Sequence, residues 1–342
     1  MKRILLLPVL MTVAHLTSAQ QVQLTNDPAN KKVTVSVDGK PFTNYIYPGT
    51  ETLKKTALYP VRTAQGTIIT RGWPMDPRAG ERVDHPHHVG VWFNHGNVNG
   101  YDFWNSSSAV DRTKHKYGDI LHTGITTVKS GRTRGELAVT ADWVSQDGAT
   151  LLKEKTTYIF RASGDARIID RIATLTAQDE VTFADSKEGM FAIRLARQLE
   201  HPSNKAEMFT DANGVATKVA SLNNEGVTGK YRNKEGVQGD DVWGKKSAWT
   251  DLEGKIGSED ISVAILDHPR NVGYPSYWHA RGYGLFAVNP MGDKEYSSKS
   301  PARNFSLKKG ESVTLRYRLV VASHHLSDQE MNTLAADFAK VK

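Results

Sequence analysis

Apolar and polar residues alternate along several stretches of the chain, and this period of two is typical of β-strands with one buried face. Residues 33–37 (VTVSV) and 41–47 (PFTNYIY) alternate in this way on either side of Asp38-Gly39, which predicts a hairpin. From about residue 114 to residue 186 the pattern recurs in a series of segments separated mostly by Gly-containing turns. These segments are 119–129, 136–145, 150–161, 166–177 and 180–185. Their spacing predicts the antiparallel meander of a β-sandwich or barrel rather than βαβ units.

The second half of the chain continues this pattern and closes with one helix. Residues 187–196 (KEGMFAIRLA), 284–288 (GLFAV) and 304–322 are further strand segments, the last with a turn at Lys309-Gly310. Ser327 and Glu330 form a capping-box pattern that precedes the apolar stripe of a packed helix. The predicted fold class is therefore all-β, with antiparallel sheets and a short C-terminal helix.

Residues 1–19 have a Lys-Arg start, an apolar middle and small residues up to Ala19, which is the pattern of a secretory signal peptide. We expect cleavage after Ala19, a single β domain over residues 20–342, and a secreted or periplasmic location in a bacterium. No other stretch approaches membrane-spanning length, and the sequence has no cysteine. The formal net charge of +7 is spread over the chain without a basic run, so no nucleic-acid partner is expected.

Residues 84–104 (DHPHHVGVWFNHGNVNGYDFW) hold the densest group of chemically active side chains. Four of the twelve histidines lie here, His85, His87, His88 and His95, followed by Asp102 and Trp104. Such rings make poor core material, but they can transfer protons and hydrogen-bond a ligand. Pro86 favours an extended His85, and the residues after it have strand-forming composition, so alternating faces are expected. We therefore predict an acid/base and hydrogen-bonding cluster at the entrance of a strand.

A second polar group lies on the strand predicted at residues 187–196. Glu188 and Arg194 flank Ala192 on the face opposite the apolar residues, which predicts the floor of a cleft. The alternative is a solvated face with a surface ion pair. Further along, Trp243 and Trp249 interrupt hydrophilic sequence, so they are either ligand platforms or aromatic plugs at the end of the sandwich.

A third polar group spans residues 267–281. Asp267 and His268 follow a buried strand, and Tyr277, His279 and Arg281 share one face of the next strand. All of these side chains can hydrogen-bond a polyhydroxylated or anionic ligand. We therefore include them among the predicted substrate-binding or acid/base residues.

The three groups together resemble a known family. The segments 84–104, 187–196, 243–249 (WGKKSAW) and 267–290 are similar to those of the PmoA-like family of exported bacterial proteins, and the similarity covers most of residues 20–342. The resemblance implies a galactose-mutarotase-like antiparallel β super-sandwich with a sugar-binding concave face. In enzymes of that architecture, histidines and a carboxylate on the concave sheet act on a sugar ring oxygen or hydroxyl.

The preferred hypothesis is a carbohydrate-active enzyme that binds a sugar or oligosaccharide and needs neither a metal nor another cofactor. His87 or His88 and His279 would be base and acid, with Glu188 as a second proton carrier. Hydrolysis, elimination and epimerisation all remain open. The substrate-binding residues predicted are His85, His95, Asp102, Trp104, Arg194, Trp243, Trp249, Asp267, His268, Tyr277 and Arg281. Hydrolysis by paired carboxylates would require Asp102 or Asp267 beside Glu188.

Two alternatives remain. His85 and His87, with His268 or His279, could form a three-histidine metal centre with an open position. The protein could also be a non-catalytic sugar-binding protein of the cell envelope. No Gly-rich phosphate loop, nucleophile elbow or cysteine nucleophile is present, which argues against nucleotide cofactors and thiol chemistry.

Overall fold

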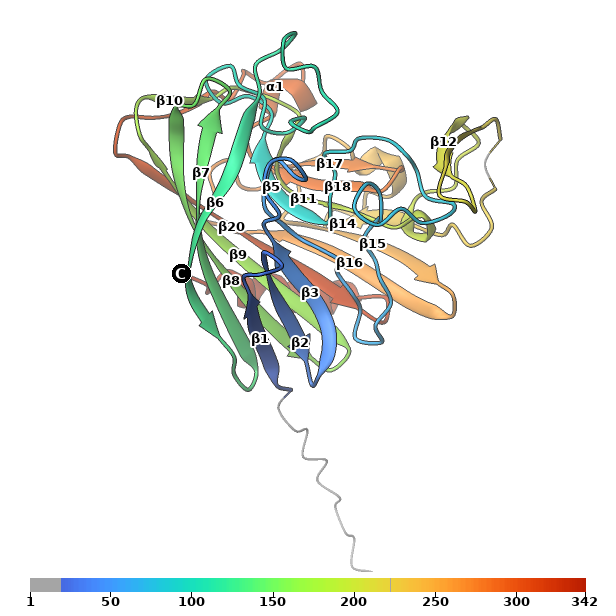
Figure 1. Ribbon diagram of the computed structural model, residues 1–342. Helices are drawn as coiled ribbons and strands as arrows, with labels where there is room; N and C mark the ends of the chain where they lie inside the picture. Colours follow the sequence, from blue (N-terminus) through green and yellow to red (C-terminus); the bar gives the residue numbers. More distant parts are fainter. Residues whose placement is uncertain (1–19, 222) are drawn as a thin grey trace, which may run out of the picture.

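Two large antiparallel β-sheets lie face to face in the computed structural model, which describes residues 20–221 and 223–342 (Figure 1). The signal peptide predicted for residues 1–19 lies outside the described residues. The first sheet has eight strands, in the order β1 (Val22–Asp27), β2 (Lys32–Val37), β3 (Lys40–Ile46), β4 (Ala57–Leu58), β5 (Val91–His95), β11 (Gly189–Arg194), β18 (Leu285–Asn289) and β17 (Tyr277–Arg281).

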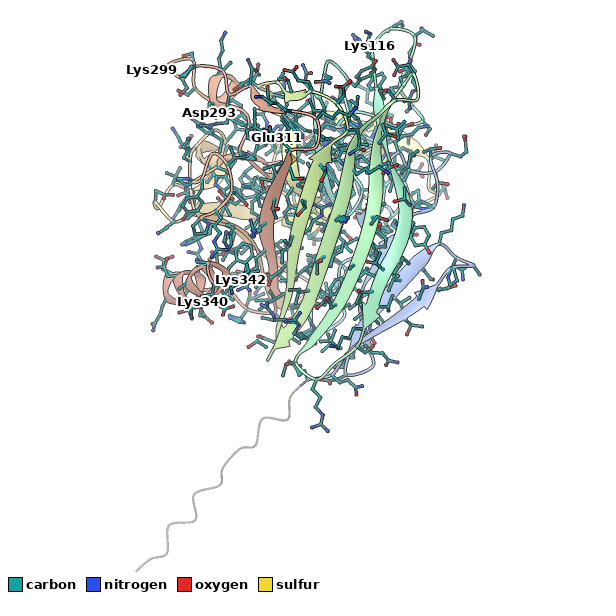
Figure 2. The ribbon with its side chains drawn as sticks, turned by 90° about the vertical axis from the view of Figure 1, so that its left-hand side faces the viewer. Lys116, Asp293, Lys299, Glu311, Lys340 and Lys342 are labelled. Atoms are coloured by element: carbon teal, nitrogen blue, oxygen red, sulfur yellow. The ribbon has the colours of Figure 1, made fainter. Side chains whose placement is uncertain are left out.

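The second sheet carries the longest strands of the protein. Its eight strands are, in order, β14 (Lys230–Asn233), β15 (Trp249–Ile256), β16 (Glu259–Asp267), β20 (Ser312–Ala322), β9 (Ala166–Ala177), β8 (Thr150–Ser163), β7 (Arg134–Ser145) and β6 (Gly118–Lys129). Figure 2 shows β6, β7, β8, β9 and β20 running side by side, so the first four strands of the predicted meander are confirmed. The fifth predicted segment, residues 180–185, is wrong as a member of this meander, because it forms a short strand that pairs with residues 305–307 outside this sheet.

The remaining elements are short. Two small antiparallel pairs are β10 (Val181–Phe183) with β19 (Phe305–Leu307) and β12 (Glu207–Thr210) with β13 (Ala216–Val219). The helices are α1 (Asp293–Tyr296), α2 (Asp328–Phe338) and the 3₁₀ turns η1 (Arg197–Leu199) and η2 (Gly239–Val242). None of the helices in the described part of the chain is long and apolar enough to cross a membrane.

The main core fills the space between the two sheets. Strand alternation sends Phe93, Phe191 and Phe286 from the first sheet against Phe160 and Leu319 from the second, all in one buried cluster. The predicted all-β, antiparallel super-sandwich with a short C-terminal helix is therefore confirmed. Because one face of the first sheet is used for this core, the polar side chains of the predicted site on β11 and β17, Arg194, His279 and Arg281, lie on the opposite, outer face.

Helix α2 covers part of the outer face of the second sheet. The predicted capping box is present: Glu330 N–H donates to Ser327 Oγ (3.3 Å), and Ser327 N–H donates to Glu330 Oε2 (2.8 Å). Met331 and Phe338 from this helix pack in a second buried cluster that includes Trp249. This packing fixes the surroundings of one of the two predicted tryptophan platforms.

Candidate active site on the outer face of the first sheet

A tight turn brings the histidines at the start of β5 together. His88 N–H donates to the His85 carbonyl (2.9 Å), and His85 has a φ of 44°. Gly90 also has a positive φ (56°), and a Cβ there would lie 2.1 Å from the Leu58 carbonyl oxygen. The strand consequently begins only at Val91, and the extended conformation expected for His85 is wrong. A non-glycine residue with positive φ is uncommon and is often found at functional sites.

Four aromatic rings form a continuous stack that starts at this turn. His85 lies between Tyr283 (ring centroids 5.4 Å apart, 2° between planes) and His88 (4.8 Å, 3°). His88 in turn stacks on Trp92 of β5 (5.0 Å, 18°). His87 meets the edge of the stack, 4.4 Å from His88 and nearly perpendicular to it. The stack holds the three histidine rings in fixed positions against the sheet.

Asp84 anchors the turn through two buried arginines. Arg194 Nη2 donates to both carboxylate oxygens (2.7 and 3.0 Å), and Arg71 forms a salt bridge with the same carboxylate. Arg71 also donates to the carbonyls of His85 (3.0 Å) and His88 (3.1 Å). Burial alone would raise the pKa of Asp84, but the His85 hydrogen bond and the two arginine charges lower it well below its usual value.

The contact with Arg194 fixes the tautomer of His88. Arg194 Nη1 lies 3.0 Å from His88 Nδ1, and because a guanidinium can only donate, Nδ1 must accept. The single ring proton of His88 is therefore on Nε2. Burial, followed by neighbouring positive charges, lowers the pKa of both His87 and His88 well below the usual value. Both predicted proton carriers are thus buried rings whose neutral form is favoured.

His85 has the geometry of an oriented acid/base group. Its Nδ1 lies 3.0 Å from Asp84 Oδ2, and its side chain is 42% exposed. A carboxylate at Nδ1 sets the tautomer and leaves Nε2 to take up a proton, which is the arrangement that makes histidine a general base. The sequence predicts His85 as a substrate-binding residue, and in the structure its exposed ring is paired with the Asp84 carboxylate.

One row across the sheet makes the floor of the site. Trp92, Ala192, Ala287 and His279 are in register on four neighbouring strands. The two alanines leave room above the sheet for Trp104, which packs in one cluster with them and stacks 6.1 Å from His279. Burial, with the Arg281 and Lys187 charges, lowers the pKa of His279 to about 3. His279, predicted as an acid/base residue, therefore lies in the floor row as a buried ring that is neutral at physiological pH.

Glu188 supplies a carboxyl group next to this floor. Asn105 Nδ2 donates to Glu188 Oε2 (2.8 Å) and to Asp102 Oδ2 (2.8 Å). Burial and then the charge of Asp102 raise the pKa of Glu188, although the Asn105 hydrogen bond opposes the shift. Asp102 also accepts from the Trp104 and Asn105 backbone N–H groups (2.8 and 2.9 Å), so it caps a turn and is no free nucleophile.

A cavity of about 520 Å³ opens beside the stack. Tyr283 lines it, so the cavity borders the ring that packs on His85. Trp243 and Arg281 line it as well, and the Arg281 guanidinium lies 4.9 Å from the centre of the Trp243 ring. An aromatic wall beside hydrogen-bond donors, in a volume of this size, suits a small polar ligand.

Five predicted residues lie apart from this arrangement. His95 is on the core side of β5, where its Nε2 is 2.7 Å from the Ala184 carbonyl. Tyr277 is on the outer face but is covered by the Tyr296 ring (5.2 Å). The other three are Trp249 and His268, which pack under helix α2, and Asp267, which accepts from the backbone of Ser276. All five side chains are buried and none lines the cavity, so none joins the candidate site.

The metal alternative has no matching arrangement in the described residues. Nowhere in residues 20–221 and 223–342 are three or more His, Asp or Glu side chains grouped so that they could hold a metal ion. His268, one of the proposed third ligands, packs against Phe338 of α2 (5.0 Å) instead. The described residues therefore do not form the three-histidine metal centre that the H-x-H pattern of His85 and His87 suggested.

The sequence reasoning missed four residues of the site: Lys55, Arg71, Asp84 and Tyr283. Lys55 is 2% exposed, and its Nζ lies 5.6 Å from the Trp92 ring centre. Burial lowers its pKa to about 7, although the charges of Asp102 and Asp119 oppose the shift. Asp84 could have been found from its place directly before the histidines, but Lys55 and Arg71 come from loops without any pattern.

Fold and site together define an antiparallel β super-sandwich with an arginine-anchored His/Asp pair on the outer face of its first sheet. The chain belongs to a family of unknown function (DUF6807), whose model matches residues 32–336. No curated protein matches the sequence.

Solved structures with a similar fold are distant. The GH36 α-galactosidase AgaB from Geobacillus stearothermophilus is 9% identical (TM-score 0.41). The match covers 88% of this chain but only 41% of the length of AgaB. A putative aldose 1-epimerase from Escherichia coli K12 is 10% identical (TM-score 0.31; 89% and 99% covered). The Slr1438 protein from Synechocystis sp. PCC 6803 is 9% identical (TM-score 0.30; 93% and 100% covered). At this level of similarity, these structures say nothing about the reaction.

Proposed function

We propose that this protein is a carbohydrate-active enzyme that transfers a proton to or from a carbon atom of a bound sugar. The observation that carries the proposal is the exposed, Asp84-oriented His85 ring, stacked on Tyr283 at the border of an aromatic-walled cavity. His85 Nε2 is the base. Glu188, whose raised pKa keeps it protonated to higher pH, is the acid.

The reaction class follows from the carboxylates. Hydrolysis by two carboxylates needs a second free carboxylate about 5–9.5 Å from the first. Asp102 is near Glu188, but its oxygens accept from Trp104, Asn105 N–H and Asn105 Nδ2. A histidine base together with a carboxylic acid of raised pKa instead supports epimerisation or elimination. We also propose, from residues 1–19 and the segments described above, that the protein is an exported member of the PmoA-like family.

The proposal is tested by proton exchange in D₂O. The protein is incubated with a panel of neutral and acidic monosaccharides and short oligosaccharides, and ¹H NMR follows deuterium incorporation, new epimers and unsaturated products. His85→Gln should lower the rate by about 10²–10⁴-fold. His324→Gln is the matched control, because His324 is 39% exposed and its Nδ1 also lies 3.0 Å from a carboxylate, that of Asp165. Sugar binding without exchange or turnover, or equal rates in both variants, would refute the proposal.

A further inference from the structure

Some of the charged side chains that line the 520 Å³ cavity contact an oppositely charged or polar partner, and others do not. Its two acidic residues each contact a lining partner: Glu207 is 3.6 Å from Arg82, and Asp240 is 3.2 Å from His201. Arg82 is further held by the buried carboxylate of Glu200 (2.7 Å). Glu207 therefore has an ionic partner within the fold, and Asp240 has the ring of His201, whose pKa is lowered by burial.

Two lining cations have no such partner. Within residues 20–221 and 223–342, neither Arg281 nor Lys205 forms a salt bridge, although both line the cavity. Arg281 is held in place by β17, where it pairs with Leu285 of β18, and by the Trp243 ring beneath its guanidinium. Arg194, on the same face and also paired with Leu285, by contrast uses both of its Nη groups on Asp84 and His88.

We infer that the cavity selects sugars that carry a carboxylate, with Arg281 as the group that binds it. The inference rests on the proposed function and specifies its substrate class. A guanidinium presents two parallel N–H donors that match a carboxylate, and stacking on Trp243 holds that fork in one orientation. Tyr283 and Trp243 then supply flat surfaces for the sugar ring, and Lys205 adds a second positive charge at the cavity wall.

The position of the carboxylate also fits the proposed chemistry. Arg281 shares the outer face with the floor row, and its charge acts on both His279 and Tyr283. Tyr283 lines the cavity next to Arg281 and stacks on the proposed base, His85, so a carboxylate bound by Arg281 lies on the same face of the sheet as that base. A carbon next to a neutralised carboxylate loses its proton more readily than one next to a hydroxyl group. An acidic sugar thus suits a histidine base better than a neutral one does.

Isothermal titration calorimetry tests the inference with glucuronate and galacturonate against glucose and galactose, each also as a short oligosaccharide. The acidic sugars should bind about 10- to 100-fold more tightly than the neutral ones, and added NaCl should weaken only the acidic ones. Arg281→Gln should abolish the difference, and Arg281→Lys should restore part of it. Arg134→Gln, a surface arginine paired with Glu136, is the charge-matched control and should leave the difference unchanged.

The outcomes separate the two proposals. Equal binding of neutral and acidic sugars refutes the acidic-sugar preference and leaves the proposed function standing. Binding of neither class refutes both. Thermal unfolding shows whether Arg281→Gln is folded. If the folded variant still prefers acidic sugars, another residue binds the carboxylate and the proposed role of Arg281 is wrong. The salt dependence of the unaltered protein is an independent measurement that needs no variant.

Discussion

The site depends on one carboxylate, and Asp84→Asn is the change that tests this dependence. Asparagine keeps the size of the side chain but removes the charge between Arg71 and Arg194. The arginine side chains are 1% and 0% exposed, and that of Asp84 is 19% exposed. Removing one partner of a buried ion pair costs about 3–5 kcal/mol, because the remaining charge is left without compensation. Since Asp84 is partly hydrated, we expect the lower end, about 3 kcal/mol.

Thermal and denaturant unfolding measure this loss. For a chain of this size, about 3 kcal/mol corresponds to a fall in Tm of roughly 5 °C. The sign of the pH dependence follows from the lowered pKa of Asp84. Its contribution to stability is complete above the unfolded-state pKa of about 4 and is lost as the pH falls toward the folded-state value. The difference between the unaltered protein and Asp84→Asn should therefore shrink below about pH 4.

Asp111→Asn is the control for this experiment. Asp111 forms an exposed pair with Lys114 (side chains 47% and 74% exposed), so the loss should be at most about 0.5 kcal/mol. If Asp84→Asn unfolds at the same temperature as Asp111→Asn, Asp84 does not hold the two arginines and the reasoning about the His85 turn fails.

Three further predictions follow from the site and from helix α2. Glu188→Gln should lower the proton-exchange rate by about 10²–10⁴-fold. In the unaltered protein the rate should fall as the pH rises past the raised pKa of Glu188, and a pH–rate profile of Glu188→Gln should lack this fall because Gln does not titrate. Trp249→Ala should cost about 3–5 kcal/mol in urea unfolding and leave sugar affinity unchanged, because Trp249 packs under α2; weaker sugar binding by a folded variant would contradict that placement. Arg318→Met removes a buried pair with Asp170 (2.6 Å) but leaves Asp170 with Arg161 (2.9 Å), so guanidinium unfolding should show a loss of about 3 kcal/mol, and no loss would contradict it.

The alternation of residues predicted most of the fold because it is a local property. Strands β6 to β9, the strand with Arg194 and the strand with His279 and Arg281 all follow from the period of two, as do the faces of these side chains. The C-terminal helix followed from its capping residues. These features depend on neighbours within about ten positions, which a single sequence displays directly.

The arrangement at residues 84–90 could not be predicted in the same way. The preference of a residue before proline for extended backbone is modest. Here the hydrogen bonds of Arg71 to the turn carbonyls and of Arg194 to Asp84 outweigh this preference for extended backbone. Arg194 lies 110 positions from Asp84 along the chain, so a local pattern does not reveal the contact. Trp249 was misleading for a related reason, since the helix that buries it comes much later in the chain. Burial of Lys55 is equally a tertiary property.

The two alanines beneath Trp104 link three distant positions. Ala192 and Ala287 are small enough to admit the indole, and all three side chains lie in one packed cluster. A larger residue at 192 or 287 would displace the ring and with it the wall beside His279. Relatives of this protein that have a larger residue at 192 or 287 should therefore have a smaller ring or an aliphatic side chain at 104. The three positions should covary so that their total side-chain volume stays constant.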